Sequence, residues 1–154
     1  MSSKPSAVVK KITVDVRATS APNGEVEFDC RWKNDGDPNG WQSGPILLPH
    51  GPEHYRLVFD LDDKSGRKLE FYEKPAEAMY VKVGSCPSEP GNGDRQIDFE
   101  QVDLSKKKLT IKDYNRDSPC SLHYMLRFDG DPHGVCPPYQ YDPEIRNGGG
   151  GIAE

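Results

Sequence analysis

Apolar and polar residues alternate with a period of two through almost every readable segment of this chain. In KKITVDVRAT (10–19), Ile12, Val14 and Val16 share one side of an extended chain, and the residues between them are charged or polar. Successive side chains of a β-strand point to opposite faces, so the pattern predicts a strand with one buried face. An amphipathic helix would instead need apolar residues three and four positions apart. The alternation therefore favours an all-β protein.

Similar patterns recur along the chain, separated by short stretches rich in Gly, Pro, Asn and Asp, which form turns. They predict strands in EVEFDCRW (25–32), HYRLVFDL (54–61), RKLEFY (67–72), AMYVKV (78–83), RQIDFEQVDL (95–104), KLTIKDY (108–114), CSLHYMLRF (120–128) and PPYQYDPEI (137–145). The turn DDKSG (62–66) is expected to join two of them as a hairpin. Only EKPAEAM (73–79) favours a helical turn, which Pro75 limits.

About eight short strands with turn residues between them predict a single antiparallel β-sandwich of immunoglobulin-like, Greek-key character, with a β-barrel as the alternative. The length of 154 residues fits one domain. We expect a flexible N-terminus over 1–9, the β-sandwich domain over 10–146 and a flexible glycine-rich tail over 147–154. Two long connections, 34–52 and 85–94, are rich in proline and glycine and are expected to be loops.

Charge and composition restrict the partners. The formal net charge of −5 and the pI near 5.4 argue against nucleic acid, because phosphate binding needs a positive patch. No apolar stretch reaches the length of a membrane span or of a leader, so we expect a cytoplasmic protein with no membrane partner. The lysines at 106–108 precede a predicted strand and would protect it if it lay at a sheet edge.

A six-residue echo is the most distinctive motif: DGDPNG (35–40) recurs as DGDPHG (129–134). Each copy matches the first half of a calcium loop with oxygen side chains at alternate positions. Position 12 of an EF-hand would be Ile46 in one copy and Gln140 in the other, so an EF-hand is rejected. The same residue types also make ordinary turns.

The two copies could nevertheless meet. Each follows a strand with an inward cysteine, and in an immunoglobulin-like fold an early and a late core strand run the same way, so both loops would leave one end of the domain. This predicts a joint Ca²⁺ site with the ligands Asp35, Asp37, Asn39, Asp129 and Asp131. We otherwise expect no cofactor.

The cysteine and histidine residues raise two further possibilities, a disulfide and a zinc site. Cys30 and Cys120 would lie about 13 Å apart along their strands, which is too far for a disulfide. The mirrored pair CSLH (120–123) and HGVC (133–136) has zinc-ligand residue types, but Cys120 and His123 should face opposite sides of their strand. The sequence therefore argues against both a Cys30–Cys120 bridge and a zinc site.

No motif of a known catalytic class occurs, so the sequence favours a non-enzymatic binding or protein-interaction module of unknown ligand, with self-association through an edge strand also compatible. Trp41, Tyr139 and Tyr141 could form an aromatic platform for a sugar or a peptide. The first alternative is a Ca²⁺-dependent ligand-binding module that uses both DGDPxG loops. The second is a small hydrolase, which would need a histidine and an acid to meet in a pocket.

Overall fold

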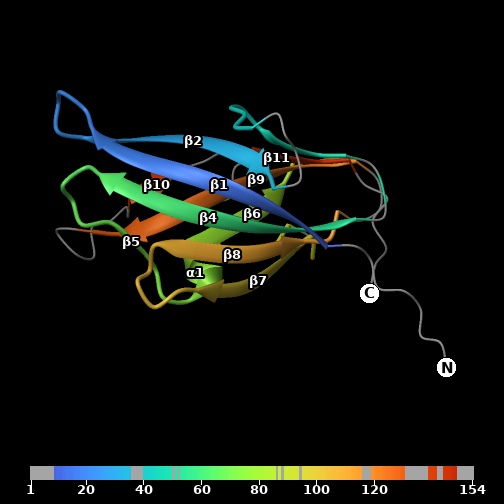
Figure 1. Ribbon diagram of the computed structural model, residues 1–154. Coiled ribbons are helices and arrows are strands. Elements are labelled where there is room, and N and C mark those ends of the chain that lie inside the picture. Colours follow the sequence, from blue (N-terminus) through green and yellow to red (C-terminus); the bar gives the residue numbers. More distant parts are fainter. Residues whose placement is uncertain are drawn as a thin grey trace.

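The structure is a computed structural model that describes residues 9–35, 40–49, 51, 53–85, 87, 89–93, 95–115, 119–130, 139–141 and 144–148. These residues form almost only strands, which confirms the all-β prediction (Figure 1). The elements are β1 (Val9–Ser20), β2 (Val26–Asn34), β3 (Ile46–Leu48), β4 (His54–Lys64), β5 (Glu70–Phe71), α1 (Pro75–Ala78), β6 (Met79–Val83), β7 (Ile97–Val102), β8 (Lys108–Asp113), β9 (Cys120–Asp129), β10 (Tyr139–Tyr141) and β11 (Glu144–Asn147).

The strands belong to two separate sheets. The first sheet has the order β2-β1-β4-β8-β7. The second sheet is centred on β9, which pairs with β10 and β11 along one edge and with β5 and β6 along the other, and β3 extends it beyond β11. Because the strand pairings do not join the two sheets into one closed ring, the barrel alternative is wrong.

Both sheets are mixed, which corrects the purely antiparallel expectation. In the first sheet β1 runs parallel to β4, and in the second β3 runs parallel to β11. Parallel neighbours cannot be joined by a tight hairpin, so each pair is connected through other elements. β3 lies inside the long connection that the sequence pattern assigned to a loop, and Asn147 belongs to β11 although we expected the tail to begin there.

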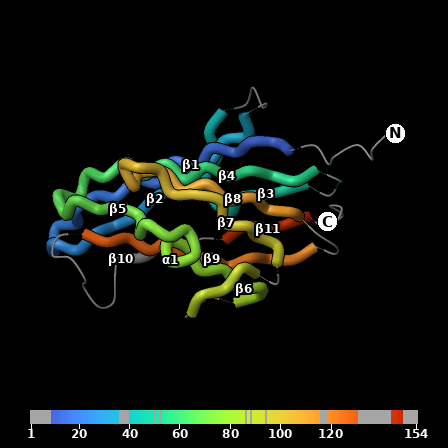
Figure 2. Tube along the Cα trace, turned by 90° about the horizontal axis from the view of Figure 1, so that it is seen from below, coloured from blue at the N-terminus to red at the C-terminus, as the bar shows by residue number. Residues whose placement is uncertain are grey.

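The core lies between the two sheets. Figure 2 shows β1, β4 and β8 on one side and β9 and β6 on the other. Aromatic rings cross the space between them: Phe28 of β2 stacks on Phe128 of β9 with 5.2 Å between ring centroids, and Phe59 of β4 meets Tyr124 of β9 at 5.5 Å. The inward positions predicted from the alternation, such as Val14, are buried.

The predicted hairpin at DDKSG is wrong. β4 does not pair with β5; instead the chain leaves the first sheet there, and β5 pairs with β9 in the second. Asp63 holds this crossing, because its Oδ1 accepts hydrogen bonds from the Ser65 amide and hydroxyl and its Oδ2 accepts one from the Leu69 amide. Burial alone would raise the pKa of Asp63, but these hydrogen bonds outweigh it and the pKa is lowered.

The lysines at 106–108 do not protect an edge strand. β8 lies between β4 and β7, so β7 is the edge of the first sheet. Lys107 instead spans the two sheets: its carbonyl accepts from the Leu61 amide, and its ammonium group donates to the carbonyl of Leu69. A basic run that looks solvated in the sequence therefore joins the end of β4 to the start of β5.

Candidate functional site

Whether the two DGDPxG loops can meet depends on the relative directions of β2 and β9, the strands that precede them. Tyr124 packs against Phe59, and four residues later Phe128 stacks on Phe28. In the register of the first sheet, Phe28 lies four residues further along β1 than Phe59 does. β9 therefore runs in the direction of β1 and opposite to β2, and Figure 1 shows the arrowheads of β2 and β9 at opposite ends.

Asp35 and Asp129 are therefore too far apart to bind one calcium ion together, as the joint site requires. Asp129 is adjacent to Phe128, whereas Asp35 follows Phe28 by seven residues, which corresponds to about 23 Å of extended strand. Two carboxylates at that separation cannot share an ion, because calcium–oxygen distances are about 2.4 Å. The error came from the assumed parallel course of the early and the late core strand.

Each aspartate has partners of its own. Oδ1 of Asp35 accepts a hydrogen bond from the Thr13 hydroxyl at 3.0 Å, and Oδ2 lies 3.7 Å from Nζ of Lys11. Oδ1 of Asp129 accepts from the amide of Gly130 at 2.9 Å, as in an ordinary turn. The other predicted ligands, Asp37, Asn39 and Asp131, lie outside the described residues.

Trp41 is 40 % exposed, in agreement with its predicted place on a loop surface. The ring lies beside the outward side chains of β2, with the guanidinium carbon of Arg31 4.4 Å and Nζ of Lys33 5.3 Å from its centroid. The structure thus gives Trp41 two cations as neighbours. Tyr139 and Tyr141 are at the ends of β10, and their side chains lie outside the described part of the structure.

The cysteine and histidine positions follow the strand pattern. Cys30 and Cys120 are not joined by a disulfide. Nε2 of His123 lies 3.4 Å from Oε2 of Glu144, the residue opposite it in the β9–β11 register. His133 and Cys136 are outside the described residues. Among the residues that are described, no three Asp, Glu, His or Cys side chains gather closely enough to hold a metal ion.

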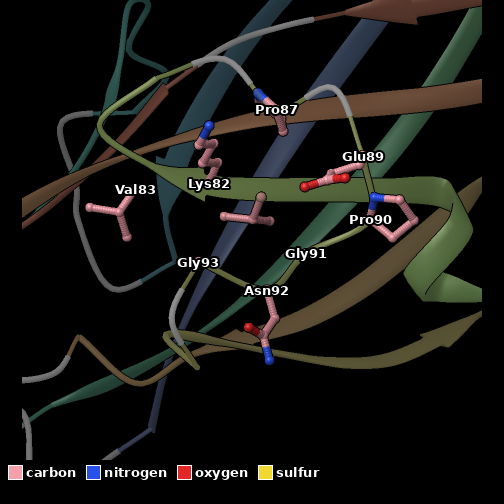
Figure 3. A pocket seen from close by; sticks show the side chains of 9 residues that line it. Lys82, Val83, Pro87, Glu89, Pro90, Gly91, Asn92 and Gly93 are labelled. Atoms are coloured by element: carbon pink, nitrogen blue, oxygen red, sulfur yellow. The ribbon is translucent and has the colours of Figure 1, made fainter.

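A hollow of about 220 Å³ lies where residues 91–93 meet β6 (Figure 3). The Val81 amide donates to the Gly91 carbonyl at 2.9 Å, and the Gly93 amide donates to the Val81 carbonyl at 3.1 Å. A Cβ atom on Gly91 would lie 2.9 Å from the Val81 oxygen, so only glycine permits this approach. The remaining lining consists of Val83, two prolines and three polar residues, and the volume is below the ~300 Å³ of usual ligand pockets.

The outward face of the first sheet is a lattice of ion pairs. Arg31 lies 3.1 Å from Asp15, and Arg56 forms two hydrogen bonds with Glu100, at 2.7 and 3.2 Å. Arg17 and Asp62 form a longer pair at 3.7 Å. Pairs exposed in this way contribute little to stability, and each of these three arginines already has an anion within the chain. This face is a solvated surface.

The outward face of the second sheet differs. The guanidinium carbon of Arg127 on β9 lies 5.0 Å from the ring centroid of Tyr72 and 4.4 Å from that of Tyr80. Nη1 of Arg127 donates to the backbone carbonyl of Glu77 at 2.8 Å, which fixes the guanidinium between the rings. We call Tyr72, Tyr80 and Arg127 the tyrosine–arginine cluster. Met125, opposite Tyr80 in the register, continues it along the same face.

The cation of this cluster has no carboxylate partner among the described residues. Its hydrogen bond to Glu77 uses one of five guanidinium N–H groups, so most of its donor capacity is left for another molecule. Burial raises the pKa of Tyr72, and the charge of Arg127 counteracts part of that rise. Tyr72 therefore remains a neutral phenol near pH 7 and supports the cation through its π face.

The sequence analysis did not identify this cluster. Alternation places Tyr80 between inward Met79 and Val81, and Arg127 between inward Leu126 and Phe128, so their outward direction was predictable. Their proximity was not, because it depends on the pairing of β9 with β5 and β6.

Among the described residues, several acidic groups gather on the Tyr72 side of the cluster. A hollow of about 280 Å³ beside Tyr72 has four acidic residues in its lining, together with Lys74 and Lys106: Glu70, Glu73, Glu77 and Asp129. On the other side, β6 continues from Tyr80 to the exposed Lys82. An anionic group would consequently approach Arg127 over Tyr80 and Met125, away from these carboxylates.

Among the described residues, we find no helix with the length and apolar character that crossing a membrane requires. Comparison with known proteins adds no relative, since neither a protein-family profile nor a curated protein sequence matches this chain.

Proposed function

We propose that this protein is a non-enzymatic protein-interaction module in which a β-sandwich presents the tyrosine–arginine cluster to a partner. The ring contacts between β2 and β9 and between β4 and β9 support the sandwich arrangement, because side chains from both sheets fill one core. The parallel pairing of β1 and β4 distinguishes it from the purely antiparallel immunoglobulin pattern.

One observation carries the proposal: Arg127 is held by two tyrosine rings and a backbone carbonyl, whereas Arg31 and Arg56 on the opposite face are neutralised by carboxylates of the chain itself. A cation that is fixed in place but not neutralised can bind an anion without losing much side-chain entropy. Tyrosine, methionine and arginine are also the residue types enriched in protein interfaces.

The chemistry of the cluster selects the partner. A planar guanidinium matches a carboxylate through two parallel hydrogen bonds, and the tyrosine rings offer apolar area around it. We therefore propose a protein segment with an Asp or Glu side chain next to an apolar or aromatic residue. Lys82 would add attraction at longer range.

A hydrolase is less well supported. His123 and Glu144 do meet, but on the outward face of the second sheet, and neither lines any of the hollows described above. Arg146 also contacts Glu144, with Nε 2.7 Å from Oε1, so the carboxylate is shared between an imidazole and a guanidinium group. This arrangement fits an ion-pair network on a sheet surface.

Selection from a random peptide library displayed on phage tests the proposal. We expect the selected peptides to carry Asp or Glu beside an apolar residue, and the replacement of that acid by its amide to weaken binding at least tenfold. The Arg127→Lys variant keeps the charge but loses the planar fork, so it should also weaken binding.

Arg31→Lys provides the matched control. Arg31 stacks on Trp41 at the same 4.4 Å that separates Arg127 from Tyr80, but it is paired with Asp15. Peptide binding should therefore be unchanged in Arg31→Lys. The proposal fails if the library yields no binder, if the binders carry no acid, or if both lysine variants bind as the unmodified protein does.

A further inference from the structure

A buried polar contact joins the ends of β8 and β11 across the two sheets. Asn147, the last residue of β11, donates from Nδ2 to Oδ1 of Asp113 at 2.9 Å and to Oε1 of Gln96 at 3.1 Å. Asp113 is the last residue of β8 in the first sheet. Their exposed fractions are 0 % for Asp113, 3 % for Asn147 and 7 % for Gln96, so water does not screen the contact.

The same group also holds the neighbouring strand. The amide of Asn115 donates to Oδ1 of Asp113 at 2.8 Å, and Nδ2 of Asn115 donates to the carbonyl of Pro49, which follows β3. β3 and β11 are parallel partners at one edge of the second sheet. Hydrogen bonds therefore attach both strands of this edge pair to the first sheet: β11 through Asn147, and the end of β3 through Asn115.

Two oxygens of the contact lack hydrogen-bond partners among the described residues: Oδ2 of Asp113 and Oδ1 of Asn147. If Asp113 were ionised, both would be acceptors facing a buried space without a donor, which is strongly unfavourable. Oδ1 of Asp113 already accepts two hydrogen bonds, so its lone pairs are used. Both N–H groups of Asn147 are also used, by Asp113 and Gln96.

A single proton satisfies both oxygens. We propose that Asp113 is a neutral carboxylic acid whose Oδ2–H donates to Oδ1 of Asn147, which closes a two-bond acid–amide pair and makes the β8–β11 contact a pH-sensitive latch. Loss of that proton leaves Oδ2 of Asp113 and Oδ1 of Asn147 facing each other as two hydrogen-bond acceptors with no hydrogen between them. The latch is then weakened, and the edge formed by β3 and β11 detaches more readily from the first sheet.

The surroundings of Asp113 favour the neutral acid. Burial raises its pKa to about 7, and the hydrogen bonds from Asn115 and Asn147 lower it only in part. On the β4 side the facing groups are Glu53, the buried His54 and Tyr55, whose own pKa is raised first by burial and then by the charges of Glu53 and Asp113.

Among the described residues, no lysine or arginine offsets this burial. Lys112 on β8 and Asp98 on β7 are opposite each other in the register and alternate with the buried positions, so they lie on the outward face of the first sheet. Glu144 and Arg146 lie on the outward face of β11 and pair with each other. Tyr114 packs its ring edge-on against His54 at 5.1 Å.

Carbon-detected NMR of the Asp113 carboxyl group tests the protonation state. We expect a titration midpoint near pH 7 in the folded protein, well above the ordinary aspartate value of 3.8. Amide hydrogen exchange then tests the latch. With an ordinary pKa of 3.8 in the open state, the opening equilibrium at Ile145 to Asn147 should rise about a hundredfold between pH 5 and pH 8, after correction for intrinsic exchange.

The Asp113→Asn variant separates the latch from general packing. Its amide N–H can donate permanently to Oδ1 of Asn147, so opening at β11 should no longer depend on pH, whereas Asp98→Asn should behave as the unmodified protein. A carboxyl midpoint below 5 overturns the proposal, as does an Asp113→Asn variant with unchanged pH dependence. If that variant does not fold, the carboxyl titration of the unmodified protein decides alone.

Discussion

At the scale of single residues, the same contact has different meanings in different electrostatic surroundings. Arg31 and Arg127 each lie 4.4 Å from the centroid of an aromatic ring, but among the described residues only Arg31 also has a carboxylate, at 3.1 Å from its Nε. A carboxylate of the same chain largely cancels the attraction of its arginine for an anion of another molecule. A cation that is held by aromatic rings still attracts such an anion. The cation–aromatic contacts alone would not show that the two arginines differ in their surroundings.

Replacing Arg127 should be visible in the titration of Tyr72. The charge of Arg127 favours the phenolate of Tyr72 and so lowers a pKa that burial raises. In Arg127→Gln that pKa should therefore rise further above its usual 10, which an NMR titration of the tyrosine ring carbons can follow. An unchanged or lowered Tyr72 pKa would mean that the guanidinium does not lie over the ring.

Burial predicts a large difference between two leucines. Leu57 is fully buried between the sheets, whereas Leu104 is fully exposed in the turn between β7 and β8. Leu57→Ala should cost about 2–5 kcal/mol of unfolding free energy, and Leu104→Ala should change it by less than about 0.5 kcal/mol. Denaturant unfolding of both variants measures the difference, and equal losses would contradict the assigned core.

At the scale of elements, alternation located strands well but not their partners. The inward positions of β1, β2, β4 and β9 follow directly from the period of two, because a half-buried strand needs it. The pairing of β5 with β9 is not contained in the residues of β5, since DDKSG has the composition of a hairpin turn. Short β3 was missed because three residues cannot display a period.

The crossing at Asp63 provides a test at this scale. Asp63→Ala removes the acceptor of the Ser65 and Leu69 amides and should cost about 1–3 kcal/mol, because these groups are partly buried. Its neighbour Asp62 makes only an exposed pair with Arg17, so Asp62→Ala should cost less than about 1 kcal/mol. If the two variants were equally stable in urea, Asp63 would not hold the crossing.

At the scale of the whole molecule, the antiparallel course of β2 and β9 separates Asp35 from Asp129, and no local sequence signal indicated it. The buried Asp113–Asn147 contact was equally hidden, since its residues are 34 positions apart and come from different sheets. Sequence reasoning reached the fold class and the outward direction of side chains. It could not reach sites that depend on which strands become neighbours.

The pH dependence of stability is a property of the whole molecule. Asp113 has a raised pKa, so its contribution is fully present below pH 3.8 and is lost as pH rises to about 7, by on the order of 4 kcal/mol. The pKa values of Asp63 and Asp103 are lowered, so their contributions are lost only as pH falls below about 4.

Stability should therefore be greatest near pH 4–5 and fall toward pH 7, as measured by urea unfolding at each pH. In Asp113→Asn the fall between pH 4 and pH 7 should largely disappear. A stability that rises over this range in the unmodified protein would contradict the buried neutral acid.

The central claim is that Arg127 meets a carboxylate of a protein partner over the tyrosine rings. NMR of arginine side-chain Nε–Hε groups tests it most directly, with a selected acidic peptide and its amide counterpart as probes. We predict that the acidic peptide shifts the Arg127 resonance downfield in a saturable manner and leaves Arg31 and Arg56 unchanged, while the amide peptide does not shift Arg127. Saturable binding that leaves Arg127 unshifted, or that shifts Arg31 instead, would contradict the claim.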